Sequence, residues 1–175
     1  TYAGNIGYGQ GLEKTVINIA KFYKNRIMFN LIGDGNSVSI IKKEINKLNL
    51  SNIVIRKPVK REELLNYYNY SDVLFLQLND VPAYENVLPS KIFDYGSFDK
   101  PILAGVVGVA KEFLNDYISE PFIFDPKDYK TAIKEIDKIL EINNLEINNN
   151  DFVKRFERTQ IMENMISSFY RVLSD

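Results

Sequence analysis

The sequence predicts an α/β fold built on a doubly wound parallel sheet, and two observations support this prediction. Short continuous apolar runs, typical of buried strands, recur along the chain, and amphipathic segments with helical spacing separate them. Strands that are apolar on both faces indicate a parallel sheet, because crossover helices then cover it above and below. We therefore expect one Rossmann-like domain over residues 1–175, with a sheet of about six strands and helices on both faces.

The expected elements alternate in a regular order. Strands are predicted at Tyr2 and at residues 27–32, 52–55, 72–78, 101–104 and 121–124. Helices are predicted at residues 12–23, 38–48 and 61–70, from Pro89, and at 110–115, 130–142 and 151–173. An Asn-rich, turn-prone spacer over residues 143–150 separates the last two helices.

The last predicted helix carries an apolar stripe that can pack on this domain or on a partner. We expect core packing for most of it. The stripe consists of Phe152, Phe156, Met162, Met165, Ile166, Phe169 and Leu173.

Composition excludes several classes of function. With 22 basic and 23 acidic residues, the chain has no overall charge that favours nucleic acid, and we expect no nucleic-acid partner. With no Cys and no His, the chain has no disulfide, no thiolate or imidazole metal ligand and no imidazole base. We therefore expect neither a bound metal nor a cofactor.

The sequence also bears on location. No apolar run is long enough to span a bilayer, and no signal peptide precedes the first predicted strand. A cytoplasmic location fits best, with any contact at the inner face of the membrane peripheral and made by the full-length protein. Because Thr1 is not Met and residues 2–4 read as the end of a strand, we expect this to be a piece of a longer protein.

A segment after the fourth predicted strand has the features of a ligand-binding unit. Pro89 suits the first position of a helix because it lacks an N–H, so the amides of Ser90 and Lys91 are expected to point out of the helix start. Those amides and the Lys91 ammonium favour a phosphate, and Asp94 can accept hydrogen bonds from sugar hydroxyls. Phosphate and sugar together indicate a nucleotide. A capped helix with solvated Lys91 and Asp94 accounts equally well for these residues alone.

Glycines follow the first predicted strand at Gly4, Gly7, Gly9 and Gly11. Their spacing does not match G-x-G-x-x-G and no Gly-Lys-Ser/Thr follows, so an NAD site and a P-loop are both disfavoured. Small residues there let phosphates approach the backbone closely. We expect this loop and the Pro89 helix to meet at the carboxyl edge of the sheet, where ligands of such folds bind.

The charged side chains offer no clear catalytic residue. Glu85 and Asp94 form the only notable acidic pair, and since one precedes the predicted helix and the other lies inside it, we assign Asp94 to binding. The basic clusters at residues 56–57 and 60–61 are expected to be solvated.

Five segments together resemble the C-terminal half of family 4 glycosyltransferases. They are residues 2–7 (YAGNIG), 33–35 (GDG), 71–73 (SDV), 88–95 (LPSKIFDY) and 100–105 (KPILAG). The chain is similar above all to the bacterial branch that builds capsule, O-antigen and other surface polysaccharides. This resemblance implies the two-domain GT-B fold, whose C-terminal domain holds a nucleotide-sugar donor and whose N-terminal domain holds the acceptor. It also implies a retaining, hexosyltransferase-type enzyme that needs no bound metal.

The resemblance implies a role for each matching position. Asp94 would bind the ribose, the amides near Ser90 and Lys91 would contact the diphosphate with the first glycine loop, and the backbone at residues 57–59 would meet the base. The donor-binding residues so implied are Gly4, Asn5, Ile6, Gly7, Gln10, Lys57, Pro58, Val59, Glu85, Asn86, Ser90, Lys91 and Asp94.

This sequence departs from the family pattern in its charged positions. Asn5 and Gln10 stand where many relatives carry an Arg and a Lys that grip the diphosphate, so Lys91 has to supply that charge. The family's paired acids are Glu at both ends, whereas here Asp94 is the second and Asn86, next to Glu85, is the first.

We therefore expect the donor-binding half of a retaining glycosyltransferase. It would transfer a sugar from a nucleoside-diphosphate sugar, UDP-linked, to a growing surface polysaccharide or a lipid-linked acceptor. Its expected partners are the nucleotide sugar and an upstream N-terminal acceptor domain, on which a C-terminal helix over residues 151–175 would pack. The fragment alone is expected to be inactive. Two alternatives stay open: a non-catalytic nucleotide-binding module that docks on a separate chain, and a UDP-sugar epimerase of GT-B fold.

Overall fold

The computed structural model describes the backbone of residues 1–142 and 146–174, with side chains up to Arg171. Residues 143–145 of the predicted spacer lie outside the described residues. The strands are β1 (Tyr2–Ala3), β2 (Phe29–Ile32), β3 (Ile53–Arg56), β4 (Leu74–Gln77), β5 (Ile102–Gly105) and β6 (Pro121–Phe124). The helices are α1 (Leu12–Phe22), α2 (Val38–Leu48), α3 (Arg61–Asn69), α4 (Lys91–Tyr95), α5 (Gly108–Tyr117), α6 (Tyr129–Glu141), α7 (Asn150–Phe156) and α8 (Arg158–Ser174), with short 3-10 turns η1 (Tyr8–Gln10) and η2 (Pro82–Tyr84).

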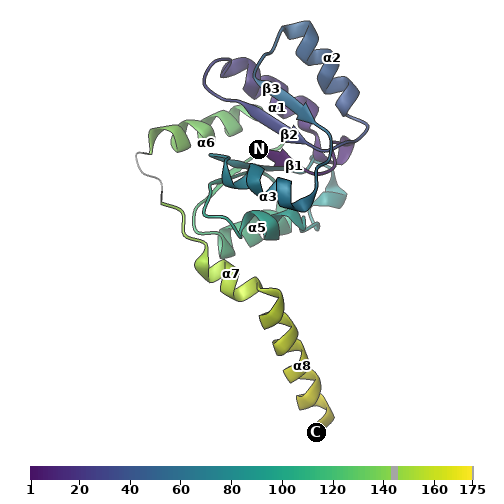
Figure 1. The fold of residues 1–175 in the computed structure, drawn as a ribbon, viewed down its shortest axis with the longest axis vertical. Helices are drawn as coiled ribbons and strands as arrows, with labels where there is room; N and C mark the ends of the chain where they lie inside the picture. Colours follow the sequence, from purple (N-terminus) through teal and green to yellow (C-terminus); the bar gives the residue numbers. More distant parts are fainter. Residues whose placement is uncertain (143–145, 175) are drawn as a thin grey trace.

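The described strands pair in parallel and form an α/β Rossmann-like sheet (Figure 1). β1, β2 and β3 make one three-stranded sheet and β4, β5 and β6 another. The two sheets meet along β1 and β4, where the Thr1 nitrogen donates to the Val73 carbonyl and Phe75 N donates to the Thr1 carbonyl, both at 2.8 Å. The strand order is therefore β3-β2-β1-β4-β5-β6, which confirms the predicted fold class. The order reverses between β1 and β4, and ligands of such sheets bind at the carboxyl ends beside that reversal.

Alternating side chains build one core on each face of the sheet. Leu31 and Phe75 belong to the core under α1, α2 and α6. Ile32 and Leu76 belong to the core under α3, α4 and α5. Burial of each such side chain contributes about 1.5–3 kcal/mol, so both cores hold the carboxyl-edge loops on a rigid support.

Two glycines let the chain segments leaving β1 and β2 run close together. Gly4 has a φ of 136° and Gly33 a φ of 152°, values that side chains other than glycine rarely adopt. A Cβ on Gly33 would overlap the Gly4 carbonyl oxygen, and the Gly4 amide donates to the Ile32 carbonyl at 2.8 Å. The first glycine loop is thereby held against the end of β2.

The helix predicted from Pro89 begins at Lys91, with Ser90 as its N-cap. The Pro89 carbonyl accepts a hydrogen bond from Ile92 N at 3.0 Å, so Pro89 belongs to the turn that enters α4. The predicted start was wrong because proline favours the first turn of a helix without determining which residue begins it.

The C-terminal helix predicted over residues 151–173 is two helices. α7 packs through buried Phe152 and through Phe156, whose ring centre lies 5.2 Å from those of Phe113 and Tyr117 on α5. Glu157, with a ψ of 130°, ends α7, and α8 then runs away from the sheet (Figure 1).

The expectation of core packing for most of the C-terminal stripe was wrong. Only Phe152 and Phe156 pack on the domain among its described side chains, and the side chain of Leu173 lies outside the described part. On α8, the side chains of five apolar residues are 47–60% exposed. We call these residues the α8 apolar face: Ile161, Met162, Met165, Ile166 and Phe169. A periodic stripe identifies a helix face that favours burial but not the surface that covers it.

Candidate functional site

A cavity of about 300 Å³ lies at the carboxyl ends of β1, β2 and β3. We call it the β1–β3 cavity. Its lining residues are Ala3, Gly4, Asn5, Ile32, Gly33, Asp34, Pro58, Val59 and Leu64. The parallel sheet thus brings the predicted site residues Gly4 and Asn5 into one cavity with Pro58 and Val59, which are far from them in the sequence.

Lys91 on α4 borders the β1–β3 cavity at Gly4. A Cβ built on Gly4 would overlap the Lys91 Nζ, and this ammonium lies 4.9 Å from the centre of the Tyr2 ring. Burial lowers the pKa of Lys91, and the nearby Asp94 carboxylate offsets part of that effect. A half-buried ammonium beside bare glycine backbone attracts an anion more strongly than a fully hydrated lysine would, since water screens it less.

Asp94 is paired with a residue that the sequence analysis assigned to solvent. Arg61 Nη2, at the start of α3, lies 3.2 Å from Asp94 Oδ1. The side chains are 73% and 38% exposed, so the ion pair contributes at most about 1 kcal/mol and leaves Asp94 accessible. Arg61 is exposed, as expected, and it is the pairing with Asp94 that the sequence analysis did not predict. No sequence signal gave the distance between α3 and α4.

Most backbone amides of the first glycine loop donate hydrogen bonds to acceptors within the protein. Besides the Gly4 amide, Ile6 N donates to the Asp34 carbonyl at 2.8 Å, and Gly7 N donates to Gln10 Oε1 at 3.2 Å. These bonds fix the shape of the loop. They also leave it with few amides for a phosphate, which differs from the contact expected of Gly4, Ile6 and Gly7.

The amides before α4 are better placed to contact a phosphate than those of the glycine loop. Gln10 Oε1 also accepts from Asn5 Nδ2 at 3.1 Å, so this neutral pair braces the loop from one side. Within the described part of the chain, the amides of Ser90 and Lys91 donate to no protein acceptor. A phosphate at this edge would therefore take its backbone hydrogen bonds from the turn that enters α4 rather than from the amides of the glycine loop.

Nine of the thirteen predicted residues do not line the β1–β3 cavity, and Lys57, Glu85 and Asn86 are three of these. Lys57 is exposed, and only its neighbours Pro58 and Val59 reach the cavity. Glu85 and Asn86 are exposed as well, and the Glu85 carbonyl accepts from Val109 N at 2.9 Å. The segment with the acidic residue therefore lies over the start of α5.

Neither a metal cluster nor a membrane span is found in the part of the chain that the structure describes. No group of three or more His, Cys, Asp or Glu residues there could hold a metal ion. No helix there is both long and apolar enough to cross a bilayer.

Comparison with known families decides what kind of domain carries this cavity. The model of the family described as glycosyl transferases group 1 matches residues 1–168. The chain belongs to the group 1 glycosyltransferases. A search of curated protein sequences found no match.

Solved structures share the fold of this glycosyltransferase domain at low sequence identity. The catalytic domain of the cholesterol-alpha-glucosyltransferase from Helicobacter pylori is 18% identical, with a TM-score of 0.61 over 80% of this chain and 85% of that one. The UDP-forming alpha,alpha-trehalose-phosphate synthase from Burkholderia vietnamiensis is 14% identical, with a TM-score of 0.72 over 99% of this chain and 44% of that one. The pneumococcal O-GlcNAc transferase GtfA, in complex with UDP and GlcNAc, is 15% identical, with a TM-score of 0.71 over 99% of this chain and 35% of that one. The chain thus spans less than half the length of the last two proteins.

One buried tyrosine positions α4 in this glycosyltransferase domain. Ala3 N donates to the Tyr95 hydroxyl at 3.3 Å, and that hydroxyl donates to the Phe75 carbonyl at 3.1 Å. Tyr95 is fully buried, which raises the pKa of its hydroxyl well above the ordinary value. The Tyr68 ring packs edge-on against it at 5.3 Å, and burial raises the pKa of Tyr68 to about 12. α4 and its Lys91 are thereby tied to β1 and β4 at the reversal of strand order.

Tyr95→Phe should therefore lower the free energy of unfolding by about 1–3 kcal/mol, because it leaves a buried amide and a buried carbonyl without a partner. Denaturant titration would measure this as a lower midpoint with an unchanged slope. Tyr70→Phe is the matched control, since Tyr70 is 88% exposed, and its effect should stay within about 0.5 kcal/mol. Equal midpoints for the two variants would contradict the role of Tyr95.

Proposed function

We propose that this chain is the donor-binding, C-terminal half of a retaining family 4 glycosyltransferase. It transfers a hexose from a nucleoside-diphosphate sugar, UDP-linked, to a growing bacterial surface polysaccharide or a lipid-linked acceptor. The observation that carries the proposal is the β1–β3 cavity bordered by Lys91 in a group 1 glycosyltransferase domain. The UDP named for GtfA and for the trehalose-phosphate synthase supports the choice of nucleotide.

The β1–β3 cavity offers distinct surroundings for each part of such a donor. The apolar side chains of Ile32, Val59 and Leu64 suit the flat base. The Asp94 carboxylate, partly exposed and oriented by Arg61, can accept hydrogen bonds from the ribose hydroxyls. The diphosphate would then lie along Gly4, with the amides of Ser90 and Lys91 as donors.

Lys91 has the main chemical role in this arrangement. When the bond to the sugar breaks, negative charge develops on the departing diphosphate, and a fixed ammonium with little water around it stabilises that charge. Neither Asn5 nor Gln10 carries charge, so Lys91 is the cation that the structure holds against the glycine backbone. This route requires no metal.

The acceptor side of the reaction belongs to the rest of the proposed full-length protein. Positioning an acceptor hydroxyl against the anomeric carbon can contribute on the order of 7–11 kcal/mol, and it requires a second surface facing the donor. The β1–β3 cavity supplies the donor surface only. We assign the acceptor surface, and with it the catalytic residue, to an upstream domain.

We assign the α8 apolar face to contact with that upstream domain. On the isolated chain this face is about half exposed, although its residues would favour burial. The structural matches to the synthase and to GtfA extend over 99% of this chain, so they include a counterpart of α8 in proteins that are much longer. Both observations support α8 as the element that joins the two halves.

UDP should raise the melting temperature of the chain, because a ligand at a hundred times its dissociation constant adds roughly 2.7 kcal/mol. Lys91→Ala should weaken the binding of UDP about tenfold or more and the binding of uridine far less, since only UDP has phosphates for the ammonium to contact. Isothermal calorimetry would measure both affinities, with exposed Lys134→Ala on α6 as the control. Asp94→Asn should weaken both ligands because they share the ribose. Stabilisation by NAD and not by UDP, or equal losses for UDP and uridine in Lys91→Ala, would refute the proposed site.

The chain of residues 1–175 should bind a UDP-sugar yet transfer no sugar, even with the correct acceptor present. Adding the upstream domain, in the same chain or as a separate one, should restore transfer, because it supplies the acceptor surface. A radiolabelled-sugar transfer assay would test this, with UDP binding by the isolated chain as the control for folding. Robust turnover by residues 1–175 alone would overturn the two-domain proposal.

The α8 assignment predicts an effect that depends on chain length. Met165→Ser combined with Phe169→Ser should destabilise the full-length protein by about 2 kcal/mol or more, since it removes apolar side chains from an interface. The same change should leave the isolated chain within about 0.5 kcal/mol, because these side chains are exposed there. Thermal unfolding of both proteins would measure the difference, with Gln160→Ala and Ser167→Ala on α8 as controls. Equal effects in the two lengths would argue against this interface.

A further inference from the structure

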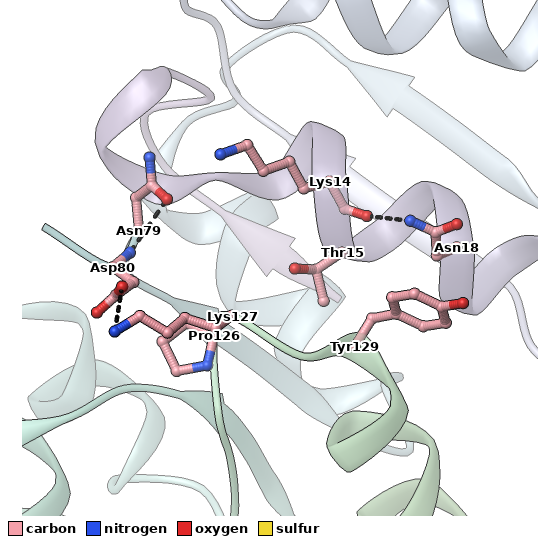
Figure 2. Close-up of a pocket in the computed structure, with 8 residues that line it drawn as sticks. All are labelled: Lys14, Thr15, Asn18, Asn79, Asp80, Pro126, Lys127 and Tyr129. Atoms are coloured by element: carbon pink, nitrogen blue, oxygen red, sulfur yellow. Dashed lines mark hydrogen bonds and ion pairs between the residues drawn. The ribbon is translucent and has the colours of Figure 1, made fainter.

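A second cavity, of about 370 Å³, shares no lining residue with the β1–β3 cavity (Figure 2). Its walls come from the first turns of α1, the loop after β4, and the segment from β6 into α6. The lining residues are Lys14, Thr15, Asn18, Asn79, Asp80, Pro126, Lys127 and Tyr129. We call it the α1–α6 cavity. Its volume falls within the range of roughly 300–1,000 Å³ that small-molecule pockets occupy.

A buried hydroxyl in this cavity lacks an acceptor for its hydrogen. Thr15 is 2% exposed, and its Oγ1 accepts a hydrogen bond from Gln77 Nε2 at 2.9 Å. The same Gln77 nitrogen donates to the Gly11 carbonyl at 3.2 Å, and because a carbonyl can only accept, this bond sets the orientation of the Gln77 amide. The Thr15 hydroxyl must direct its own hydrogen elsewhere, and within the described residues no acceptor receives it. Because Thr15 lines the cavity, its hydrogen is available to a bound ligand.

The charged residues that line the α1–α6 cavity are two lysines, Lys14 and Lys127, and one aspartate, Asp80. Lys127 Nζ lies 2.7 Å from Asp80 Oδ2, and this hydrogen-bonded partner raises the pKa of Lys127. The pair is neutral as a unit. Lys14 has no carboxylate within ion-pair distance in the part of the chain that the structure describes, and Figure 2 shows its side chain extending from α1 toward Asn79. Lys14 therefore supplies an uncompensated ammonium at the rim.

Hydrogen bonds of the protein itself fix Asn79 at the rim of the α1–α6 cavity. Asn79 is 8% exposed, and its Nδ2 donates to the Tyr8 carbonyl at 3.0 Å while its backbone amide donates to the Gly9 carbonyl at 2.8 Å. Its Oδ1 accepts from Asp80 N at 3.0 Å. A preformed cavity loses little conformational entropy on binding, which favours a specific small ligand.

We propose that the α1–α6 cavity is a second ligand site, and that it binds the oxyanion of a small polar molecule, a phosphate ester or a carboxylate. The cavity presents hydrogen-bond donors in Lys14 and Thr15, whereas its one lining carboxylate, Asp80, is already paired. An oxyanion accepts hydrogen bonds and carries the opposite charge, so it satisfies both features at once. A neutral polyol would satisfy the donors but would leave the charge of Lys14 unmatched. The proposal rests on these residues alone and does not depend on donor binding at the β1–β3 cavity.

The test uses three molecules of similar size that differ in charge. Glycerol 3-phosphate, glycerate and glycerol would each be titrated into the ¹⁵N-labelled chain while amide chemical shifts are recorded. Glycerol 3-phosphate, glycerate or both should shift the amides of Lys14, Thr15, Asn18 and Tyr129, and glycerol should not. The anion that binds more tightly identifies the source of the oxyanion as a phosphate ester or a carboxylate.

Variants then test the named contacts. Lys14→Gln should raise the dissociation constant of the anion about fivefold, the upper end for an exposed charge, while Lys42→Gln, at an exposed position of α2, should leave it unchanged. Thr15→Val should weaken binding further, and Thr15→Ser, which keeps the hydroxyl, should not. Any of four results would overturn the proposal. The anions could leave these amides unshifted or shift those around Gly4 and Lys91 instead. Glycerol could bind as tightly as the anions, or the two lysine variants could have equal effects.

Discussion

The seam between β1 and β4 is the constraint on which the rest of this structure depends. Thr1 pairs with the β4 chain on one side, and the buried Tyr95 hydroxyl links Ala3 to Phe75 on the other. Without this seam the described strands are two separate sheets, each with an unpaired edge. With it, the strand order reverses at one place and the loops after β1 and β4 diverge there. Both cavities lie on the loops beside this reversal, and α4 is tied to it directly.

The glycine loop carries no positively charged side chain and has few free amides, so it contributes little to anion binding at this edge of the sheet. Most backbone amides of the loop donate to acceptors within the protein. The two positions where a cation was expected to bind the diphosphate hold the neutral residues Asn5 and Gln10, which hydrogen-bond each other. Positive charge comes instead from side chains on other elements. Lys91 lies half-buried against Gly4, and Arg61 is held by Asp94. A site of this kind relies on the Lys91 ammonium and the amides at the start of α4 rather than on a backbone nest in the glycine loop, so its affinity for anions depends strongly on how firmly α4 is packed.

The sequence predicted which residues lie at the same edge of the sheet better than it predicted the distances between loops. Gly4 and Asn5 were expected at the carboxyl edge because parallel strands end on the same side, and the family resemblance added Pro58 and Val59; in the structure all four line one cavity. Arg61 was missed and Glu85 lies elsewhere, because both depend on distances between loops that no periodicity encodes. The apolar stripe of residues 152–173 was recognised, yet among its described side chains only Phe152 and Phe156 pack on this domain. Helical spacing reports which residues share a face and carries no information about the surface opposite.

By itself, the sequence determined the class of fold, the order of strands and helices, and the absence of any His or Cys chemistry. These follow from local physics: apolar runs favour buried strands, amphipathic runs favour covering helices, and composition limits the available side chains. Only the tertiary structure decided that α4 begins at Lys91, that the Lys91 ammonium lies against Gly4, and that Thr15 faces a separate cavity with an uncommitted hydrogen. Each of these depends on how elements distant in sequence pack together, and packing is settled by the sum of many contacts rather than by any one segment.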